Sequence, residues 1–241
     1  MKTALVTGGT KGIGKAVALA FLERGFEVVI NYHDDEETAL ATQEEFNMLG
    51  YCPVLMRADV SDEMQVKQMF REFFGIYEKL DVLVNNAGVS LVRVIQDTTS
   101  ADWNTVFDVN VKGVYHCCRA VADNMICYGG GCIINIASIW GEIGASCEVA
   151  YSASKGAVIA FTKALSKELA PSKVRVNCVS PGVIDTGMNS HLTAGEMESL
   201  IEQIPAGRIG YPADVAKACV YLAEAYYVTG EVLSVGGGFG K

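Results

Sequence analysis

The hydrophobic positions of the chain fall into short runs separated by amphipathic stretches. Seven runs rich in Val, Ile and Leu stand at 3–7, 27–32, 53–59, 81–87, 132–138, 174–180 and 231–237. Such nearly continuous apolar runs are typical of strands covered on both faces of a sheet. Segments with helical spacing of apolar residues, such as 64–74, lie between them. This alternation predicts right-handed crossovers and a mostly parallel sheet with helices on both faces.

The chain shows no sign of an internal boundary. Its 241 residues suffice for one large α/β domain or two small ones. It contains no repeat, low-complexity segment or Pro/Ser-rich linker, so we expect one domain over residues 1–241. The least strand-like stretch, about 187–211, stands between the sixth strand and the last helix and is a candidate lid.

Composition and charge limit the partners. Half of the residues are hydrophobic, yet no apolar run reaches the roughly 18 residues of a membrane-spanning helix. The sequence opens with a strand-like run and glycines instead of a signal-peptide pattern, so we expect a soluble, cytoplasmic protein without a membrane partner. The net charge of −9, without a Lys/Arg cluster, argues against a nucleic-acid partner.

Cysteines and histidines form no metal-binding pattern. The eight cysteines lack CxxC spacing and lie mostly inside apolar runs, so we expect buried thiols in a reducing compartment. His33, His116 and His191 are far apart in sequence. We therefore predict no metal site.

A glycine-rich turn follows the first strand. Residues 7–14 read TGGTKGIG and lead into a helix, and the turn can place backbone amides close to a pyrophosphate at the helix N-terminus. The spacing departs from GxGxxG, so the strand-turn-helix context carries the prediction, with a ligand-free glycine turn as the alternative. The predicted cofactor contacts here are Gly8, Thr10, Lys11, Gly12, Ile13 and Gly14.

Further candidate contacts follow the third and fourth strands. In a doubly wound sheet the ligand crosses the carboxyl ends of the strands. Asp59, next to Val60, can accept a hydrogen bond from an adenine amino group. Asn86, Ala87 and Gly88 offer a narrow backbone edge along a ribose. Turn formation or strand capping is the structural alternative for each residue.

The end of the second strand bears on the choice of cofactor. A carboxylate there holds a free 2′-hydroxyl and repels a 2′-phosphate. The chain has Asn31, Tyr32 and His33 instead, and Lys11 in the glycine turn can reach toward a phosphate. This favours NADPH, with Tyr32 and His33 as contacts. Two aspartates follow at once, so NADH stays possible.

Tyr151 and Lys155 stand one helical turn apart in the segment YSASK. A free phenol has a pKa of about 10 and gives up its proton reluctantly at neutral pH unless a nearby cation stabilises the phenolate. Lys155 supplies such a cation. Ser138, at the end of the fifth strand, can polarise a carbonyl oxygen that gains negative charge as hydride arrives at carbon. Taken singly, the three residues are more typical of surface and strand-end positions.

These motifs resemble the short-chain dehydrogenase/reductase family over essentially the whole chain. The matching segments are 7–14, NNAG at 85–88, Asn110 within 106–114, Ser138, YSASK at 151–155 and PGVIDT at 181–186. The resemblance implies a single NAD(P)-binding Rossmann domain, an α/β fold whose seven-stranded parallel sheet has the order 3-2-1-4-5-6-7.

The resemblance also implies roles for individual residues. Tyr151 is the expected general acid in reduction, Ser138 the hydrogen-bond donor to the substrate carbonyl, and Lys155 the ligand of the nicotinamide-ribose hydroxyls. Asn110 is expected to hold a water in a proton relay. The residues expected to position the nicotinamide carboxamide are Pro181, Gly182, Ile184 and Thr186.

Within the family, 3-oxoacyl-acyl-carrier-protein reductases resemble the chain most, through residues 5–14 and 229–238. This resemblance implies NADPH reduction of a 3-oxoacyl thioester to the 3-hydroxyacyl product, in a homotetramer. One departure stands against it. Those reductases carry basic residues just before the fifth strand, for docking of an acidic carrier, whereas this chain reads CYGGGCIINIAS.

A second hypothesis starts from Glu142 and Glu148, on the loop between Ser138 and Tyr151. If they face the pocket they favour a substrate with an ammonium group; otherwise they are ordinary surface acids. The loop also resembles aminopentanone reductases that complete a lysine modification on elongation factor P. A third hypothesis, an NADP-binding regulator that has lost catalysis, predicts a missing catalytic residue, and all four are present.

Overall fold

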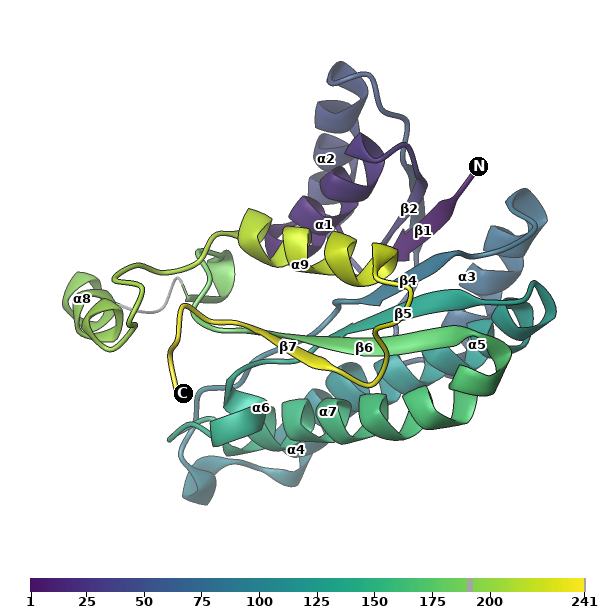
Figure 1. The fold of residues 1–241 in the computed structure, drawn as a ribbon. Coiled ribbons are helices and arrows are strands. Elements are labelled where there is room, and N and C mark those ends of the chain that lie inside the picture. The colour runs from purple at the N-terminus through teal and green to yellow at the C-terminus, as the bar shows by residue number, and fades with distance from the viewer. Residues whose placement is uncertain (190–192, 241) are drawn as a thin grey trace.

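A parallel sheet of seven strands lies at the centre of the molecule, between two layers of helices (Figure 1). The structure, a computed structural model, describes residues 1–189 and 193–240. The strand order is β3-β2-β1-β4-β5-β6-β7, so the predicted fold class and strand order are confirmed. The strands are β1 (Thr3–Val6), β2 (Glu27–Tyr32), β3 (Val54–Arg57), β4 (Val82–Asn85), β5 (Gly131–Ile136), β6 (Val174–Pro181) and β7 (Val232–Val235).

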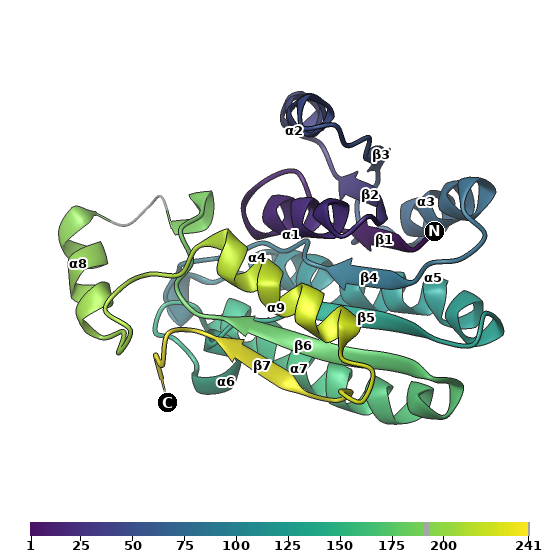
Figure 2. The ribbon, with the colours of Figure 1, turned by 45° about the horizontal axis from the view of Figure 1, so that its top comes forward.

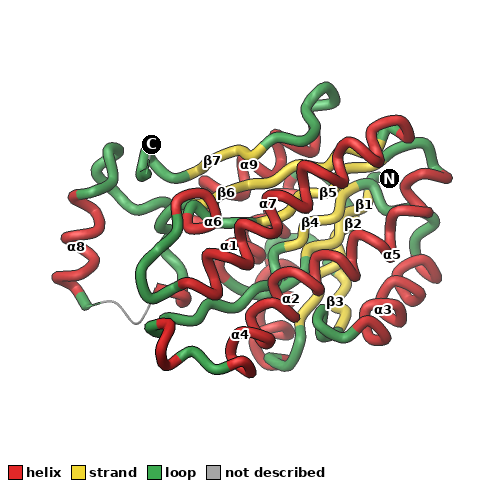
Figure 3. The backbone as a smooth tube through the Cα atoms, turned by 90° about the horizontal axis from the view of Figure 1, so that it is seen from below, coloured by secondary structure: helices red, strands yellow, loops and turns green. Residues whose placement is uncertain are grey.

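The long helices divide between the two faces of the sheet, as Figures 2 and 3 show from two further directions. One face carries α1 (Gly12–Glu23), α2 (Glu36–Met48) and α9 (Pro212–Glu224). The other face carries α3 (Glu63–Ile76), α5 (Gly113–Cys127) and α7 (Val149–Leu169). Shorter helices lie in connections that leave the carboxyl ends of strands: α4 (Ser100–Phe107), α6 (Trp140–Ile143) and α8 (Ala194–Glu202).

Helix α3 illustrates how the sequence pattern produces a covering helix. Its buried residues Val66, Met69, Phe70 and Phe73 recur at helical spacing and face the sheet. Burying each large apolar side chain contributes about 1.5–3 kcal/mol. Asp62 precedes the helix, and its side chain accepts hydrogen bonds from main-chain amides of the first turn.

Main-chain hydrogen bonds join the loops at the carboxyl ends of the strands. Thr7 N donates to Val84 O at 3.0 Å, and Ala137 N donates to Val179 O at 2.8 Å. The connections that follow β1, β4, β5 and β6 therefore meet at one edge of the sheet, where a doubly wound fold binds its ligand.

The stretch predicted as a lid contains a short 3-10 helix (Gly187–Asn189) and α8. Residues 190–192, and with them His191, lie outside the described residues. In Figure 1, α8 stands apart from the two helical layers, on the side where β6 ends.

The prediction of buried cysteines holds for five of the eight: Cys117, Cys118, Cys132, Cys178 and Cys219. It is wrong for the other three. Cys52 and Cys127 are exposed and Cys147 is partly exposed, because they lie in the connection before β3, at the last residue of α5 and in the loop before α7.

Two further findings concern metals and membranes. Within residues 1–189 and 193–240, no three His, Cys, Asp or Glu side chains group as ligands for a metal ion. No helix in that part of the chain is long and apolar enough to span a bilayer.

Candidate active site

The glycine turn forms a cradle that side chains would fill. A Cβ on Gly14 would lie 2.2 Å from Gly8 O and 2.5 Å from Asn86 Nδ2. Gly8 itself has a φ of +59°, which other residues rarely adopt. No side chain caps the N-terminus of α1, so its first amides can bind an anion. The turn therefore fits the pyrophosphate of a dinucleotide.

Asn86 fastens the end of β4 to this turn. Its Nδ2 donates to Thr7 O at 3.0 Å and to Gly8 O at 2.9 Å, while Thr7 Oγ1 accepts from the amides of Asn86 and Ala87 at 3.0 Å each. The side chain thus joins the end of β4 to the turn, which is a structural role of the kind that the sequence analysis gave as the alternative for this residue. It leaves the backbone edge of Ala87 and Gly88 beside the cradle.

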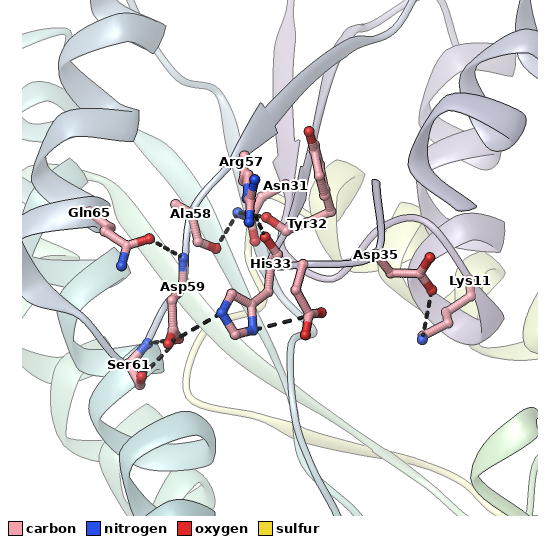
Figure 4. A network of polar contacts seen from close by, with 11 residues as sticks. Lys11, Asn31, Tyr32, His33, Asp35, Arg57, Ala58, Asp59, Ser61 and Gln65 are labelled. Atoms are coloured by element: carbon pink, nitrogen blue, oxygen red, sulfur yellow. Dashed lines mark hydrogen bonds and ion pairs between the residues drawn. The ribbon is translucent and has the colours of Figure 1, made fainter. Parts of the chain in front are cut away.

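Asn31 also has a structural role, because its side chain joins neighbouring strands. It is 1% exposed, and its Nδ2 donates to Ala58 O at 3.0 Å and to Met56 O at 3.3 Å (Figure 4). It ties β2 to β3 beneath the turn. Of the three residues considered at the end of β2, Tyr32 and His33 remain as candidates, and Tyr32 points away from His33 in Figure 4.

His33 and Asp59 face each other at the outer end of the site (Figure 4). His33 Nε2 lies 3.6 Å from Asp59 Oδ2, and Asp59 Oδ1 accepts from the amide and hydroxyl of Ser61 at 2.9 and 2.7 Å. Val60, predicted beside Asp59 as a contact, is 6% exposed and packs against Gly113.

Arg57, which the sequence interpretation missed, brings a cation to the same place. Its Nε donates to His33 O at 3.0 Å, and the residue is exposed at the end of β3. Lys11 Nζ, which was predicted to reach a phosphate, lies 3.5 Å from Asp35 Oδ2. The parallel register of β2 and β3 sets Arg57 beside Tyr32, and this pairing is the feature that would have indicated Arg57 as a candidate contact.

The four predicted catalytic residues meet at the inner end of the site. Ser138, Tyr151 and Lys155 line one cavity of about 280 Å³. Asn110 is fully buried behind it: a Cβ on Gly88 would lie 3.2 Å from Asn110 Oδ1 and 3.4 Å from Lys155 Nζ. Residues more than 40 positions apart in sequence are therefore gathered around the carboxyl ends of β4 and β5.

Burial sets the protonation of the phenol. Tyr151 is 7% exposed, and burial raises its pKa to about 12, although hydrogen bonding with Ser138 acts in the opposite direction. The sequence suggested that the Lys155 ammonium would stabilise the phenolate. Lys155 Nζ lies 5.7 Å from the centre of the Tyr151 ring, and burial is the largest influence on the pKa of the phenol. At neutral pH the phenol is protonated.

Lys155 is held by the end of β5. Its Nζ donates to Ile136 O at 2.9 Å, and burial lowers its pKa to about 8. An ammonium group has three donors, so two remain for a ligand in the cavity. At pH 7 the group is mostly charged, and hydroxyl groups of a ribose are suitable acceptors.

Asn110 lies in a π-helical turn (Asp108–Lys112) between α4 and α5. Its Oδ1 accepts from Val89 N at 2.8 Å, and its Nδ2 donates to Val89 O at 2.9 Å and to Ser154 Oγ at 3.0 Å. Both donors are used inside the protein, so the side chain anchors the loop after β4 to α7. Only one Oδ1 lone pair remains for the predicted water.

The two loop acids separate in the structure. Glu148 lines the cavity, and its charge raises the pKa of Tyr151, whereas Glu142 lies in α6 and is not part of the lining. Ile13, Asn86 and Gly88 from the cofactor predictions line the same cavity, as do Pro181, Gly182, Ile184 and Thr186 after β6. Further lining residues that the sequence interpretation missed are mostly apolar: Ser90, Val92, Ile136, Ala137, Trp140, Val183, Met188 and Leu200.

Comparison with known proteins agrees with this geometry. The model of a family described as Enoyl-(Acyl carrier protein) reductase matches residues 8–240. A 3-oxoacyl-[acyl-carrier-protein] reductase from Staphylococcus aureus (strain Mu50) is 37% identical over 239 residues, which cover 98% of this chain and 97% of the relative. Proteins of the same name from Chlamydia trachomatis and Chlamydia pneumoniae are 38% and 39% identical, each over 98% of this chain and 96% of the relative.

Proposed function

Because the chain belongs to the short-chain dehydrogenase/reductase family, we propose that it reduces 3-oxoacyl thioesters to 3-hydroxyacyl products with NADPH. Membership of the family makes it an oxidoreductase that acts on a carbonyl or hydroxyl group and uses a nicotinamide cofactor. The observation that carries the proposal is the cavity in which Ser138, Tyr151 and Lys155 meet beside the glycine cradle. The names of the relatives support the substrate class.

Tyr151 acts as the proton donor in this proposal. A bound nicotinamide cofactor supplies hydride to the carbonyl carbon. The Tyr151 phenol, with a pKa of about 12, is protonated at neutral pH and gives its proton to the carbonyl oxygen as negative charge develops there. An alkoxide is a stronger base than a phenolate, so this transfer is favourable even with the raised pKa.

Ser138 and Lys155 prepare the site for this transfer. The Ser138 hydroxyl, in hydrogen-bonding contact with Tyr151, orients the substrate oxygen toward the phenol. Lys155 holds the ribose with its two remaining donors and brings positive charge near the phenolate that forms. Asn110 positions the loop after β4, and we retain the predicted relay water at its remaining lone pair.

The segment 187–211 is suited to cover the cavity. Met188 and Leu200 belong to the cavity lining although they lie in this segment. Apolar side chains at the mouth exclude water from the reacting atoms and accept the start of an acyl chain. We therefore retain the lid as part of the proposal.

The substrate proposal is tested by following oxidation of NADPH in the presence of acetoacetyl-CoA and then of a carrier-linked 3-oxoacyl thioester. We expect turnover of both, with a higher kcat/KM for the carrier-linked substrate. If NADPH were oxidised with neither thioester, this substrate class would be refuted, and the assignment of the reaction type would not be affected.

The preference for NADPH rests on the cations at the outer end of the site. Arg57 and Lys11 are exposed there, and a 2′-phosphate forms charge-assisted hydrogen bonds with such groups. We expect Arg57→Ser to raise the KM for NADPH about tenfold, since one such bond is worth about 1.5–3 kcal/mol. The KM for NADH stays unchanged.

The matched control for this prediction is Arg71→Ser, which removes an exposed arginine from α3. It leaves both KM values as they are in the unsubstituted protein. A preference of the unsubstituted protein for NADH, or an equal effect of Arg57→Ser on both cofactors, contradicts the proposed role.

One observation favours a second substrate class, an amino-ketone. Glu148 lies in the cavity lining with Trp140, and among the described lining residues Lys155 is the one cation. A carboxylate beside an aromatic ring attracts an ammonium group. The hypothesis of an aminopentanone reductase therefore depends on Glu148 and no longer on Glu142.

Glu148→Gln separates the two substrate classes. The probes are an amino-ketone, 5-amino-2-pentanone, and the matching neutral ketone, 2-pentanone. If the substrate carries an ammonium group, the substitution raises the KM for the amino-ketone about fivefold, close to 1 kcal/mol, and leaves that for the neutral ketone unchanged. Glu142→Gln is the matched control and changes neither constant. Equal effects of Glu148→Gln on the two ketones rule out recognition of the ammonium group by this carboxylate.

A further inference from the structure

A second cleft lies at the opposite edge of the sheet, where the strands begin. It has a volume of about 800 Å³ and is formed by the connections that enter β1, β2, β4, β5, β6 and β7. In Figure 1 this edge is the side of the N-terminus and of the α5–β5 turn, whereas α6 and α8 lie on the other side. The catalytic residues stand at the carboxyl ends, so the length of the strands separates the two sites.

Cations predominate among the residues that line this cleft. Lys2, Lys79, Lys173 and Arg175 belong to the lining, and Asp81 is the one carboxylate among the lining residues that the structure describes. The whole chain carries a net charge of −9. The cleft therefore concentrates positive charge on an otherwise acidic protein, and such a concentration attracts anions.

Asp81, the one carboxylate among the described lining residues, already accepts hydrogen bonds. Asp81 accepts from Lys79 Nζ at 2.7 Å and from Thr3 N at 2.8 Å, so Lys79 and Asp81 balance each other. Lys2 Nζ lies 3.4 Å from the Tyr226 hydroxyl, and Lys173 is exposed. Neither Lys2 nor Lys173 forms an ion pair with a carboxylate in the described part of the chain.

Arg175 adds a buried charge beneath the cleft. It is 9% exposed and donates to three main-chain carbonyls, those of Leu222, Ala223 and Val228, at 2.6–3.1 Å. Leu222 and Ala223 lie in the last turn of α9, so the helix dipole offsets part of the charge and the guanidinium keeps the remainder. A charge held out of water in this way is screened little, and it raises the potential at the cleft above it.

Among the lining residues that the structure describes are three tyrosine rings, of which Tyr226 contacts the cations of the cleft. Tyr128, Tyr226 and Tyr227 line the cleft with 48%, 75% and 104% of their surface exposed. Arg175 lies 5.7 Å from the centre of the Tyr226 ring, which fixes one face of that ring. An exposed ring next to an ammonium group offers a flat surface on which a planar ligand stacks.

We propose that this cleft binds a small aromatic phosphate ester. Lys2 and Lys173 take its phosphate oxygens, Arg175 contributes through its field, and Tyr226 or Tyr227 receives its ring. Lysine ammonium groups suit a phosphate because they act as point charges with rotatable donors. The proposal concerns a site distinct from the active site and does not depend on the reaction catalysed there.

The test is calorimetric titration of the full chain with phenyl phosphate, at a saturating concentration of the nicotinamide cofactor so that the glycine cradle is filled. We expect one phenyl phosphate to bind per chain, and inorganic phosphate to bind more weakly. Raising the salt concentration weakens both. Lys2→Gln/Lys173→Gln weakens phenyl phosphate binding at least about tenfold, the value of two lost charge-assisted contacts.

Two further double variants test whether binding is specific to the cleft. Lys67→Gln/Lys217→Gln removes two exposed lysines outside the cleft and leaves the affinity unchanged. Tyr226→Ala/Tyr227→Ala reduces the affinity for phenyl phosphate to that for inorganic phosphate. Thermal unfolding checks that the variants fold. Absence of binding at millimolar phenyl phosphate, or binding that survives Lys2→Gln/Lys173→Gln, overturns the proposal.

Discussion

Tyr151→Phe lowers the rate of ketone reduction about a thousandfold or more, while the affinity for the cofactor stays within about twofold of the original. The reason is chemical, because the substitution removes the hydroxyl that delivers the proton and leaves the ring in place. General acid catalysis contributes about 10²- to 10⁴-fold to a rate. In this cavity the hydroxyl of Tyr151 is hydrogen-bonded with Ser138, so it is the group placed to deliver the proton. The measurement is kcat under saturating cofactor and ketone, together with a titration of the cofactor.

A second tyrosine serves as the control. Tyr128→Phe removes an exposed hydroxyl at the far edge of the sheet and leaves kcat unchanged. If Tyr151→Phe retained more than about a tenth of the original rate, the phenol could not be the principal acid. An equal loss of cofactor affinity would instead indicate that the hydroxyl acts mainly in binding.

The fold followed from the sequence because each strand is short, apolar and bounded by a helical segment. Strands such as those at 27–32 and 174–180 are buried on both faces, and few folds other than a sheet covered by helices on both sides accommodate such strands. That Ser138 and Asn86 lie at one edge of the sheet could also be predicted, since both mark the ends of strands and parallel strands bring their ends together. Spacing and context sufficed for their position, and their functional roles stay a proposal.

The sequence could not show where individual side chains point. Glu142 and Glu148 stand on the same loop, yet only Glu148 lines the cavity, because one lies in the short helix α6 and the other immediately precedes α7. Asn31 stands near the end of β2, where an acid would indicate NAD, but its amide donates to the carbonyls of Met56 and Ala58. Arg57 was missed because its neighbour His33 is 24 positions away.

The pKa of Tyr151 differed from what the sequence suggested for a related reason. A tyrosine and a lysine one turn apart suggest a phenol with a lowered pKa, because a neighbouring cation is the visible feature of the sequence. Burial is not visible there, and it raises the pKa of Tyr151 and lowers that of Lys155. At pH 7 the site therefore holds a neutral Tyr151 and a cationic Lys155, which is the state that the proposed reduction requires.

Gly14→Ala is expected to abolish tight cofactor binding, with a loss of affinity of about a hundredfold. The new Cβ would lie 2.2 Å from Gly8 O and 2.5 Å from Asn86 Nδ2, far inside van der Waals contact, and one of these atoms belongs to the backbone. The turn must open, which moves its amides away from the pyrophosphate, and the loss of two hydrogen bonds to a charged group at about 1.5 kcal/mol each corresponds to roughly a hundredfold in affinity. Overpacking also lowers the free energy of unfolding by about 1–3 kcal/mol.

Gly75→Ala provides the matched control for this substitution. Gly75 lies in α3 with nothing within 4 Å of its added Cβ, and alanine is favoured over glycine in a helix by about 1 kcal/mol. We expect Gly75→Ala to unfold at the same or a slightly higher temperature and to bind the cofactor normally. Cofactor titration and thermal unfolding of the two variants show whether the loss comes from the Cβ that fills the glycine cradle or from any replacement of glycine by alanine. Normal cofactor affinity in Gly14→Ala would show that the pyrophosphate does not rest on this turn, and the binding mode proposed for the dinucleotide would have to be abandoned.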